Sequence, residues 1–362
     1  MLATLVFIII FGILITVHEF GHFIAAKRSG VRVDRFSIGF GPKLCSVRRN
    51  GTEYVISALP FGGYVKLGGD NYQEFRSAPD EYLSQPVHKR FWIIFSGPLV
   101  NYLIGFLFFW VIFCFGYPTL TNKVGEVMDG YGAKSAGIAA GDRIVSIEGK
   151  SVKTWEDIQR ALQSNRGKPQ LSVTVLRDGA ARNFQISLLP VSRPDALGQK
   201  RSSGIMGVKP DMKETVKVRY GPVEAAYHGF KRTVDLTVLT YKAFWFMISG
   251  KLSFKDSVTG PVGMFMITSE IAKLGIIALL NWTALLSVSL GIFNLIPFPA
   301  LDGGHILLLG LEKIRGKKLG PKAEDTLNQV GFGFIILLAV AVFYNDLSRY
   351  GFFNKVFHLF GK

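Results

Sequence analysis

The sequence is poor in cysteine and lacks basic residues at its start. Only Cys45 and Cys114 occur among its 362 residues. Two cysteines cannot build the disulfide framework of a small secreted scaffold. We expect no disulfide, because one cysteine should lie in a cytoplasmic loop and the other within a membrane span. No lysine or arginine precedes Lys27, so the first apolar run lacks the basic start of a cleaved signal peptide.

Charged residues are absent from four apolar runs. About 20 apolar residues let a helix cross a bilayer, and charges within such a run are strongly disfavoured. The second and third runs exceed this length, whereas the first reaches it only if its helix continues through His18–Ala26. The sequence thus predicts a multi-pass α-helical membrane protein with four transmembrane helices. The runs are 1–17, 91–118, 274–301 and 330–345.

The net charge of +16 would suit a nucleic-acid partner, but the basic residues are distributed as in a membrane protein. Lys27 and Arg28 directly follow the first span, and Lys89 and Arg90 precede the second. Short loops rich in lysine and arginine stay on the cytoplasmic side. This places the loop 27–90 in the cytoplasm and the long segment between the second and third spans outside. We expect contacts with lipid headgroups and none with nucleic acid.

The loop 27–90 is predicted to hold a membrane-associated β sheet. Residues 31–67 alternate in polarity and are punctuated by glycine, a pattern typical of short strands and hairpins. Asn50-Gly51 lies between two β-prone runs, and this pair favours a two-residue hairpin turn. Residues 68–90 are polar and contain two prolines, which indicates a loosely packed loop.

Residues 121–190 are predicted to form a separate α+β module. Asp178-Gly179 marks a hairpin between two alternating strands. The stretch resembles a PDZ domain of the bacterial, protease-associated kind, most specifically in Ala-Ala-Gly-Asp-Arg-Ile at 139–144 and Ile-Glu-Gly at 147–149. The resemblance implies one inserted PDZ domain, in which a peptide or a substrate tail adds as a strand to the sheet edge.

The segments between the PDZ-like stretch and the third span are predicted from their composition. Residues 191–215 contain prolines and charges and are expected to be a linker, and 222–250 are predicted to form an aromatic-rich amphipathic helix on the membrane surface. In chain order we expect the first span at 1–26, a cytoplasmic β-rich loop at 27–90, the second span at 91–117, the PDZ domain at 121–190, the linker and interfacial helix at 191–273, the third span at 274–301, a cytoplasmic loop at 302–329, the fourth span at 330–347 and a tail at 348–362.

The pattern that points most directly to chemistry is His18-Glu19-Phe-Gly-His22, at the end of the first span. Residues four apart lie on one face of a helix, so both imidazoles can reach one metal ion. Glu19 lies beside that ion and can take a proton from a water molecule that zinc activates for attack on a peptide carbonyl. Ionisable groups within an apolar helix are costly and normally mark function, although a merely polar helix end is the structural alternative.

Asp302 is the best candidate for a third metal ligand. A catalytic zinc ion needs three protein ligands and one open position. Asp302 follows a long uncharged run, and Pro297 and Pro299 just before it cannot continue a helix without losing hydrogen bonds. Irregular backbone at membrane depth is tolerated where protein or a watery cavity surrounds it. The carboxylate could therefore complete a site of two histidines and one acid.

Together these motifs resemble the site-2 protease family of intramembrane metalloproteases. The resemblance rests on His-Glu-Phe-Gly-His at 18–22 and on Asn-x-x-Pro-x-Pro-x-Leu-Asp-Gly at 294–303. It is closest to the bacterial regulators of envelope stress that cleave membrane-bound anti-sigma factors, in a form with a single PDZ domain. Further matches are Gly-Phe-Gly-Pro at 39–42, Ser-Gly-Pro at 96–98 with Asn101, and Gly-Pro-Val-Gly at 260–263.

The resemblance implies a role for each motif residue. His18, His22 and Asp302 would bind Zn²⁺, and Glu19 would be the catalytic base. Substrate binding or oxyanion stabilisation is implied for Asn294, Asn101, Gly41 and Gly63, although Asn101 could simply bridge helices. His305 would either support Asp302 or be a polar residue at the cytoplasmic interface.

The implied function is intramembrane zinc proteolysis of single-span membrane proteins, such as anti-sigma factors or remnant signal peptides. The location would be the bacterial inner membrane, with the PDZ domain on the periplasmic or extracellular side. Because the better-known envelope-stress members have two PDZ domains, a size-filter role is less secure here. A membrane-anchored PDZ scaffold with a structural metal and a transporter that uses His18 and Asp302 as a relay are alternatives. Glu19 speaks against the scaffold, and the lack of repeated halves speaks against the transporter.

Overall fold

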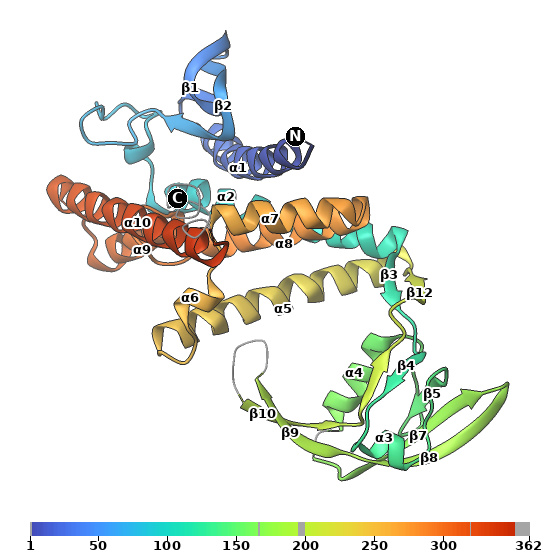
Figure 1. The fold of residues 1–362 in the computed structure, drawn as a ribbon. Coiled ribbons are helices and arrows are strands. Elements are labelled where there is room, and N and C mark those ends of the chain that lie inside the picture. The colour runs from blue at the N-terminus through green and yellow to red at the C-terminus, as the bar shows by residue number, and fades with distance from the viewer. Residues whose placement is uncertain (1, 166, 195–199, 319, 352–362) are drawn as a thin grey trace, which may run out of the picture. The chain divides into compact units, whose positions relative to one another are not determined.

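The computed structural model describes residues 2–165, 167–194, 200–318 and 320–351. It divides into two compact units (Figure 1). The first unit comprises 1–112, 226–241 and 253–362, and the second comprises 113–225 and 242–252. Below they are called the membrane unit and the α+β unit.

Four helices in the described ranges are long and apolar enough to cross a membrane. α1 continues through the two histidines to Arg28, as the first span requires. It ends where Gly30 adopts a left-handed conformation with φ of 78°, which a glycine tolerates at a helix end. The fourth predicted span belongs to a helix that begins nine residues earlier than the expected start at residue 330. The four helices are α1 (Leu2–Arg28), α2 (Val87–Phe115), α8 (Ile276–Asn294) and α10 (Pro321–Arg349).

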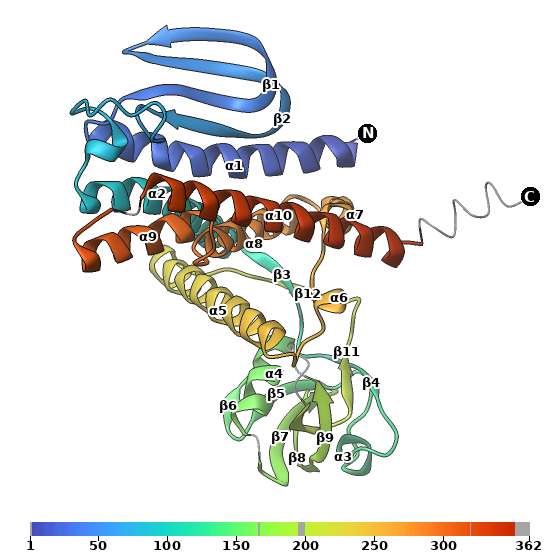
Figure 2. The same ribbon diagram turned by 90° about the vertical axis from the view of Figure 1, so that its left-hand side faces the viewer.

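The β-rich loop folds as one antiparallel sheet beside α1 (Figure 2). Its two long strands, β1 (Val33–Arg49) and β2 (Thr52–Leu67), each bend back, so that their halves pair as four short strands in the order 43–49, 52–57, 35–38 and 63–67. Asn50 and Gly51 form the predicted turn, with φ of 48° and 78°. The segment 63–67 is the outer strand of the sheet, and it contacts α1 through Val65 and Glu19.

The third span breaks where the prolines predicted it would. α8 ends at Asn294, and Pro297 and Pro299 lie in the irregular stretch that follows. The chain then enters α9 (Asp302–Arg315) rather than the loop expected for 302–329. Asp302 is in the first turn of this helix, and Gly303 and Gly304 next to it lie so close to the carbonyls of Ile296 and Phe298 that a side chain would clash.

Short helices connect these parts of the membrane unit, and a buried carboxylate from α10 holds the start of one of them. Asp346 near the end of α10 is fully buried, and its carboxylate accepts hydrogen bonds from the backbone N–H groups of Gly260 at 3.0 Å and Gly263 at 2.8 Å. This carboxylate satisfies two of the free N–H groups at the start of α7. The connecting elements are the 3₁₀ helix η1 (Tyr82–Ser84), α6 (Phe254–Ser257) and α7 (Pro261–Lys273).

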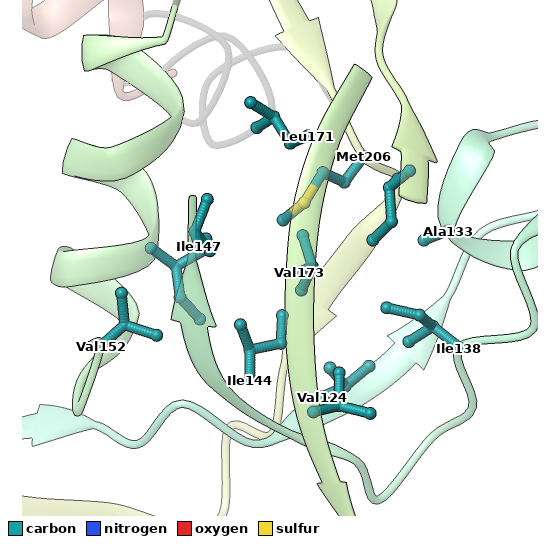
Figure 3. Close-up of a cluster of buried hydrophobic side chains, with 12 residues drawn as sticks. Val124, Ala133, Ile138, Ile144, Ile147, Val152, Leu171, Val173 and Met206 are labelled. Carbon is teal, nitrogen blue, oxygen red and sulfur yellow. The ribbon is translucent and has the colours of Figure 1, made fainter. Parts of the chain in front are cut away.

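The α+β unit has its own apolar core (Figure 3). Its sheet is antiparallel with strand order β6-β5-β7-β8. Ile144 and Ile147 from β5 and Val173 from β7 point into one cluster together with Met206. Thr154 caps α4 through a reciprocal pair of hydrogen bonds with Asp157. The elements are α3 (Gly132–Ser135), β5 (Arg143–Ile147), β6 (Lys150–Ser151), α4 (Trp155–Ser164), β7 (Gln170–Arg177) and β8 (Ala180–Ser187).

The described residues of 191–215, a segment expected to be a linker, contribute strands instead. β9 (Leu189–Pro194) pairs with β10 (Lys200–Ile205). β11 (Val208–Pro210) pairs with β4 (Val124–Val127), and β12 (Thr215–Val218) pairs with β3 (Tyr117–Leu120). In β12 valine alternates with polar residues, a pattern that suits a strand, and the partners of β11 and β12, which are β4 and β3, lie far away in the sequence. The linker prediction is wrong.

α5 (Pro222–Ile248) is the helix predicted for 222–250. Apolar side chains recur along it at helical spacing and remain exposed, among them Tyr227, Phe230, Val234, Tyr241 and Trp245. The predicted tail lies outside the described residues from position 352 onward.

Candidate metal centre

Three side chains from α1 and α9 converge on one point in the membrane unit. His18 Nε2 lies 3.1 Å from Asp302 Oδ2, and His22 Nε2 lies 3.5 Å from the same oxygen. The two Nε2 atoms are 3.2 Å apart. Both imidazoles are buried. Among the described residues, these three form the group of histidine, cysteine and acidic side chains that could hold a metal ion.

The spacing of these atoms fits zinc. Zinc binds histidine nitrogen and carboxylate oxygen at roughly 2.0–2.2 Å, so two ligands in a tetrahedron lie about 3.3 Å apart. The three measured separations of 3.1, 3.2 and 3.5 Å bracket that value. Asp302 Oδ2 is also buried without an aligned hydrogen bond. A buried acceptor without a donor is costly unless a cation satisfies it, so the donor set fits a bound metal ion.

α2 contacts the outer side of both imidazoles. His22 Nδ1 donates to the carbonyl oxygen of Ile93 at 2.8 Å, and His18 Nδ1 lies 3.2 Å from the side-chain amide of Asn101. Gly97 lies between them in the sequence of α2, and any side chain there would clash with the imidazole of His22. The helix therefore approaches the metal centre closely because position 97 has no side chain.

Glu19 lies next to the converging atoms and is held by the β sheet. Its Oε2 accepts a hydrogen bond from the backbone N–H of Val65 at 3.1 Å. Val65 belongs to the outer strand 63–67, whose inner neighbour at this position is Phe36. The sheet thus fixes the carboxylate of Glu19 through a backbone group that sequence reasoning could not identify.

A cavity of about 490 Å³ opens beside these residues. Its lining includes His18, Glu19, His22 and Asp302, together with Asn294 and His305 from the predicted set. Cavities that combine apolar walls with a few convergent polar groups are the usual place for a substrate. Asn294 is the last residue of α8, and His305 lies on α9 one turn after Asp302.

The structure separates the other predicted substrate residues from this cavity. Asn101 is fully buried against the His18 ring. Gly63 pairs with Ile38 in the sheet, and Gly41 lies at the bend of β1. Among the described residues that line the cavity, the sheet contributes Val65 and Leu67 rather than either glycine. Val65 and the carbonyl of Ile93 act through their backbones, so no side-chain motif could have indicated them.

Two histidines beside a glutamate on a helix able to cross a bilayer, joined by an aspartate from a second helix, define a metalloenzyme of the membrane. The chain belongs to peptidase family M50, whose model matches residues 6–338. It is a zinc metalloprotease of the site-2 protease type, and Zn²⁺ is its cofactor. The predicted family and enzyme class are therefore confirmed, as is the coarser prediction of a membrane protein with a β-rich region.

Similar proteins extend over nearly the whole chain. "Putative zinc metalloprotease R01501" of Rhizobium meliloti is 34% identical over 360 residues, which cover 94% of this chain and 95% of that protein. "Zinc metalloprotease RasP" of Oceanobacillus iheyensis is 28% identical over 429 residues, covering 96% and 99%. A solved PDZ domain of an SdrC-like protein from Listeria monocytogenes is 18% identical over 26% of this chain and 88% of its own, with a TM-score of 0.21.

Proposed function

We propose that this protease cleaves single-span membrane proteins within or beside the bilayer, with anti-sigma factors or remnant signal peptides as the substrate class. His18, His22 and Asp302 hold the zinc ion, and Glu19 is the general base. The observation that supports this most strongly is the near-tetrahedral spacing of three buried ligand atoms on helices α1 and α9. α1 is itself long and apolar enough to cross the membrane.

The chemistry follows from how the chain holds its groups. A bound zinc ion supplies Lewis acidity, which makes a water molecule nucleophilic near neutral pH and polarises the scissile carbonyl. Glu19, fixed by the Val65 N–H, takes a proton from the attacking water and delivers it to the leaving amine. Asn294 lines the same cavity, and its side-chain amide is suited to donate a hydrogen bond to the developing oxyanion.

The outer strand of the sheet is suited to hold the substrate. A transmembrane helix engages its carbonyl groups in internal hydrogen bonds, so it must unwind before it can be cut. An unwound segment needs partners for its backbone, and strand addition to a sheet edge supplies them. The strand 63–67 is the outer strand of its sheet and contacts Glu19, which places an edge beside the catalytic carboxylate.

Orientation and the PDZ role belong to the same proposal. Basic residues at both ends of the loop 27–90 favour its cytoplasmic placement in a bacterial inner membrane. The α+β unit then lies on the periplasmic or extracellular side, where its PDZ domain would bind a peptide or a substrate tail. Exposed aromatic side chains along α5 suit the lipid surface.

Cleavage of a single-span reporter in a host that lacks its own site-2 protease tests the proposal. We expect Glu19→Gln to retain zinc and lose cleavage, because only the proton carrier is removed. Asp302→Ala should lose both. Glu126→Gln, at an exposed position of the α+β unit, is the matched control and should cleave normally. Residual cleavage by Glu19→Gln, or full zinc content in Asp302→Ala, would contradict the assigned roles.

A further inference from the structure

α2 provides none of the proposed zinc ligands, yet it contacts both of the proposed histidine ligands. Ile93, Gly97 and Asn101 recur every four residues, so they lie along one face of the helix. That face meets α1 at the imidazoles of His18 and His22. Groups that bind the second nitrogen of a metal-bound histidine fix which nitrogen carries the proton and how the ring is oriented.

The contact to His22 defines its protonation. A backbone carbonyl can only accept a hydrogen bond, so His22 Nδ1 must carry the proton that it donates to Ile93 at 2.8 Å. The lone pair is then on Nε2, the nitrogen that faces Asp302. The Ile93 carbonyl thus prepares His22 to bind a cation.

The contact to His18 can do the same only in one orientation of the Asn101 amide. With the nitrogen toward His18 Nδ1, the amide donates, and the proton of a neutral ring must move to Nε2, where it blocks metal binding. A half-turn of the side-chain amide exchanges its oxygen and nitrogen, which are nearly equal in size. In the structure Asn101 Nδ2 faces His18 Nδ1, and Oδ1 has no hydrogen-bond partner among the described residues. A half-turn of the amide therefore breaks no bond other than the His18 contact, and the ring decides the orientation.

We infer that Asn101 Oδ1 accepts a hydrogen bond from His18 Nδ1–H and thereby holds the ring as a zinc ligand. This inference rests on the proposed role of His18. Asn101 is then a positioning residue that acts through the histidine and not on the substrate. Asn101 is completely buried and is not among the residues that line the cavity, which agrees with this role.

The Asn101 backbone is itself anchored by α8. Ser287 Oγ donates to the carbonyl oxygen of Asn101 at 2.8 Å, and both residues are fully buried. One helical turn further on, Gly105 packs against Val288 of the same helix so closely that a side chain would clash. The amide therefore stands on a fixed section of backbone, which a positioning residue requires.

Two near-isosteric variants separate an acceptor from a donor at position 101. Asn101→Asp keeps an oxygen that can accept from His18, whereas Asn101→Leu removes all hydrogen bonding at similar size. We would measure the Kd for zinc of the purified full-length protein in detergent by competition with a chromophoric chelator. Asn101→Leu should weaken zinc binding about 10–100-fold, the usual effect of losing such a partner. Asn101→Asp should remain within about threefold of the wild type.

Controls make each result decisive. Ser287→Ala removes the anchor of the backbone but keeps the amide, so it should weaken zinc binding less than Asn101→Leu does. If Asn101→Leu binds zinc like the wild type, or Asn101→Asp is as impaired as Asn101→Leu, the inference is wrong. Should Asn101→Leu fail to fold, Asn101→Asp alone decides, because a donor role predicts its impairment. If His18→Ala also binds zinc normally, the proposed ligand set fails, and not merely the role of Asn101.

Discussion

The metal centre and the α+β unit achieve order by different means. The α+β unit packs a continuous apolar cluster around β5 and β7 and begins its helix α4 with a local capping box. The metal centre joins α1, α2 and α9 through buried polar atoms and a glycine that leaves no room for a side chain. A local apolar core tolerates small losses, whereas a polar site assembled from distant segments depends on each contact.

The largest effect is expected at Gly97. In Gly97→Ala the new methyl group clashes with the His22 imidazole, so a ligand must move even though the helix is preserved. We expect zinc affinity to fall by more than about 100-fold, because both a ligand and its Ile93 partner are displaced. Gly310→Ala is the matched control, since a methyl group at that position of α9 meets open space. Equal zinc Kd values for the two variants would show that α2 does not constrain the site.

The second-largest effect is expected from breaking the ion pair between Arg90 of α2 and Glu312 of α9. The Arg90 side chain is 4% exposed and that of Glu312 is 13% exposed. Removing one partner leaves a buried charge uncompensated, which costs on the order of 3–5 kcal/mol. Glu312→Gln should therefore lower the melting temperature of the membrane unit. It should also weaken zinc binding, because Glu312 lies on α9, the helix that carries Asp302. Hydrogen exchange should show unchanged protection in β5 and β7, and a loss of protection there would mean the two units do not respond separately.

Asp142 offers a pH test within the α+β unit. Burial raises the pKa of this carboxyl, but hydrogen bonds from Arg177 and the Ala139 N–H outweigh burial, so the pKa lies below its ordinary value. A depressed pKa contributes stability above the unfolded pKa of about 3.9, and that stability is lost as the pH falls through the folded value.

Asp142→Asn should thus destabilise the α+β unit by about 2 kcal/mol at neutral pH and flatten its acid transition. Hydrogen exchange of β5 and β7 between pH 3 and 7 reports both effects. An unchanged acid transition in the variant would assign the pH dependence to other carboxylates.

The smallest effect is expected at the cap of α4. Thr154→Ala removes the hydrogen bond to Asp157 and should cost about 1 kcal/mol, seen as faster exchange in α4. Zinc Kd should not change. A shift of zinc affinity in this variant would contradict the separate character of the two regions.

What the sequence could predict depended on how local each signal is. The two histidines on α1, the break at Pro297 and Pro299 and the turn at Asn50-Gly51 arise from neighbouring residues, and each was found where expected. The convergence of Asp302 with the histidines was expected from the family pattern, and the structure brings their atoms together.

Other features depend on partners far along the chain. β11 and β12 pair with β4 and β3 from the start of the unit, and no local pattern identifies those partners. In the first turn of α9, Gly303 lies so close to the carbonyl of Ile296 that it leaves no room for a side chain. Val65 and Ile93 contact the site through their backbones, so their side chains carried no signal.

X-ray absorption at the zinc edge of the purified full-length protein tests the central claim most directly. We expect nitrogen and oxygen ligands at roughly 2.0–2.2 Å with the multiple scattering of two imidazoles, and a changed or absent signal in Asp302→Ala. Sulfur ligands near 2.3 Å, or an identical spectrum in Asp302→Ala, would contradict a zinc ion held jointly by α1 and α9.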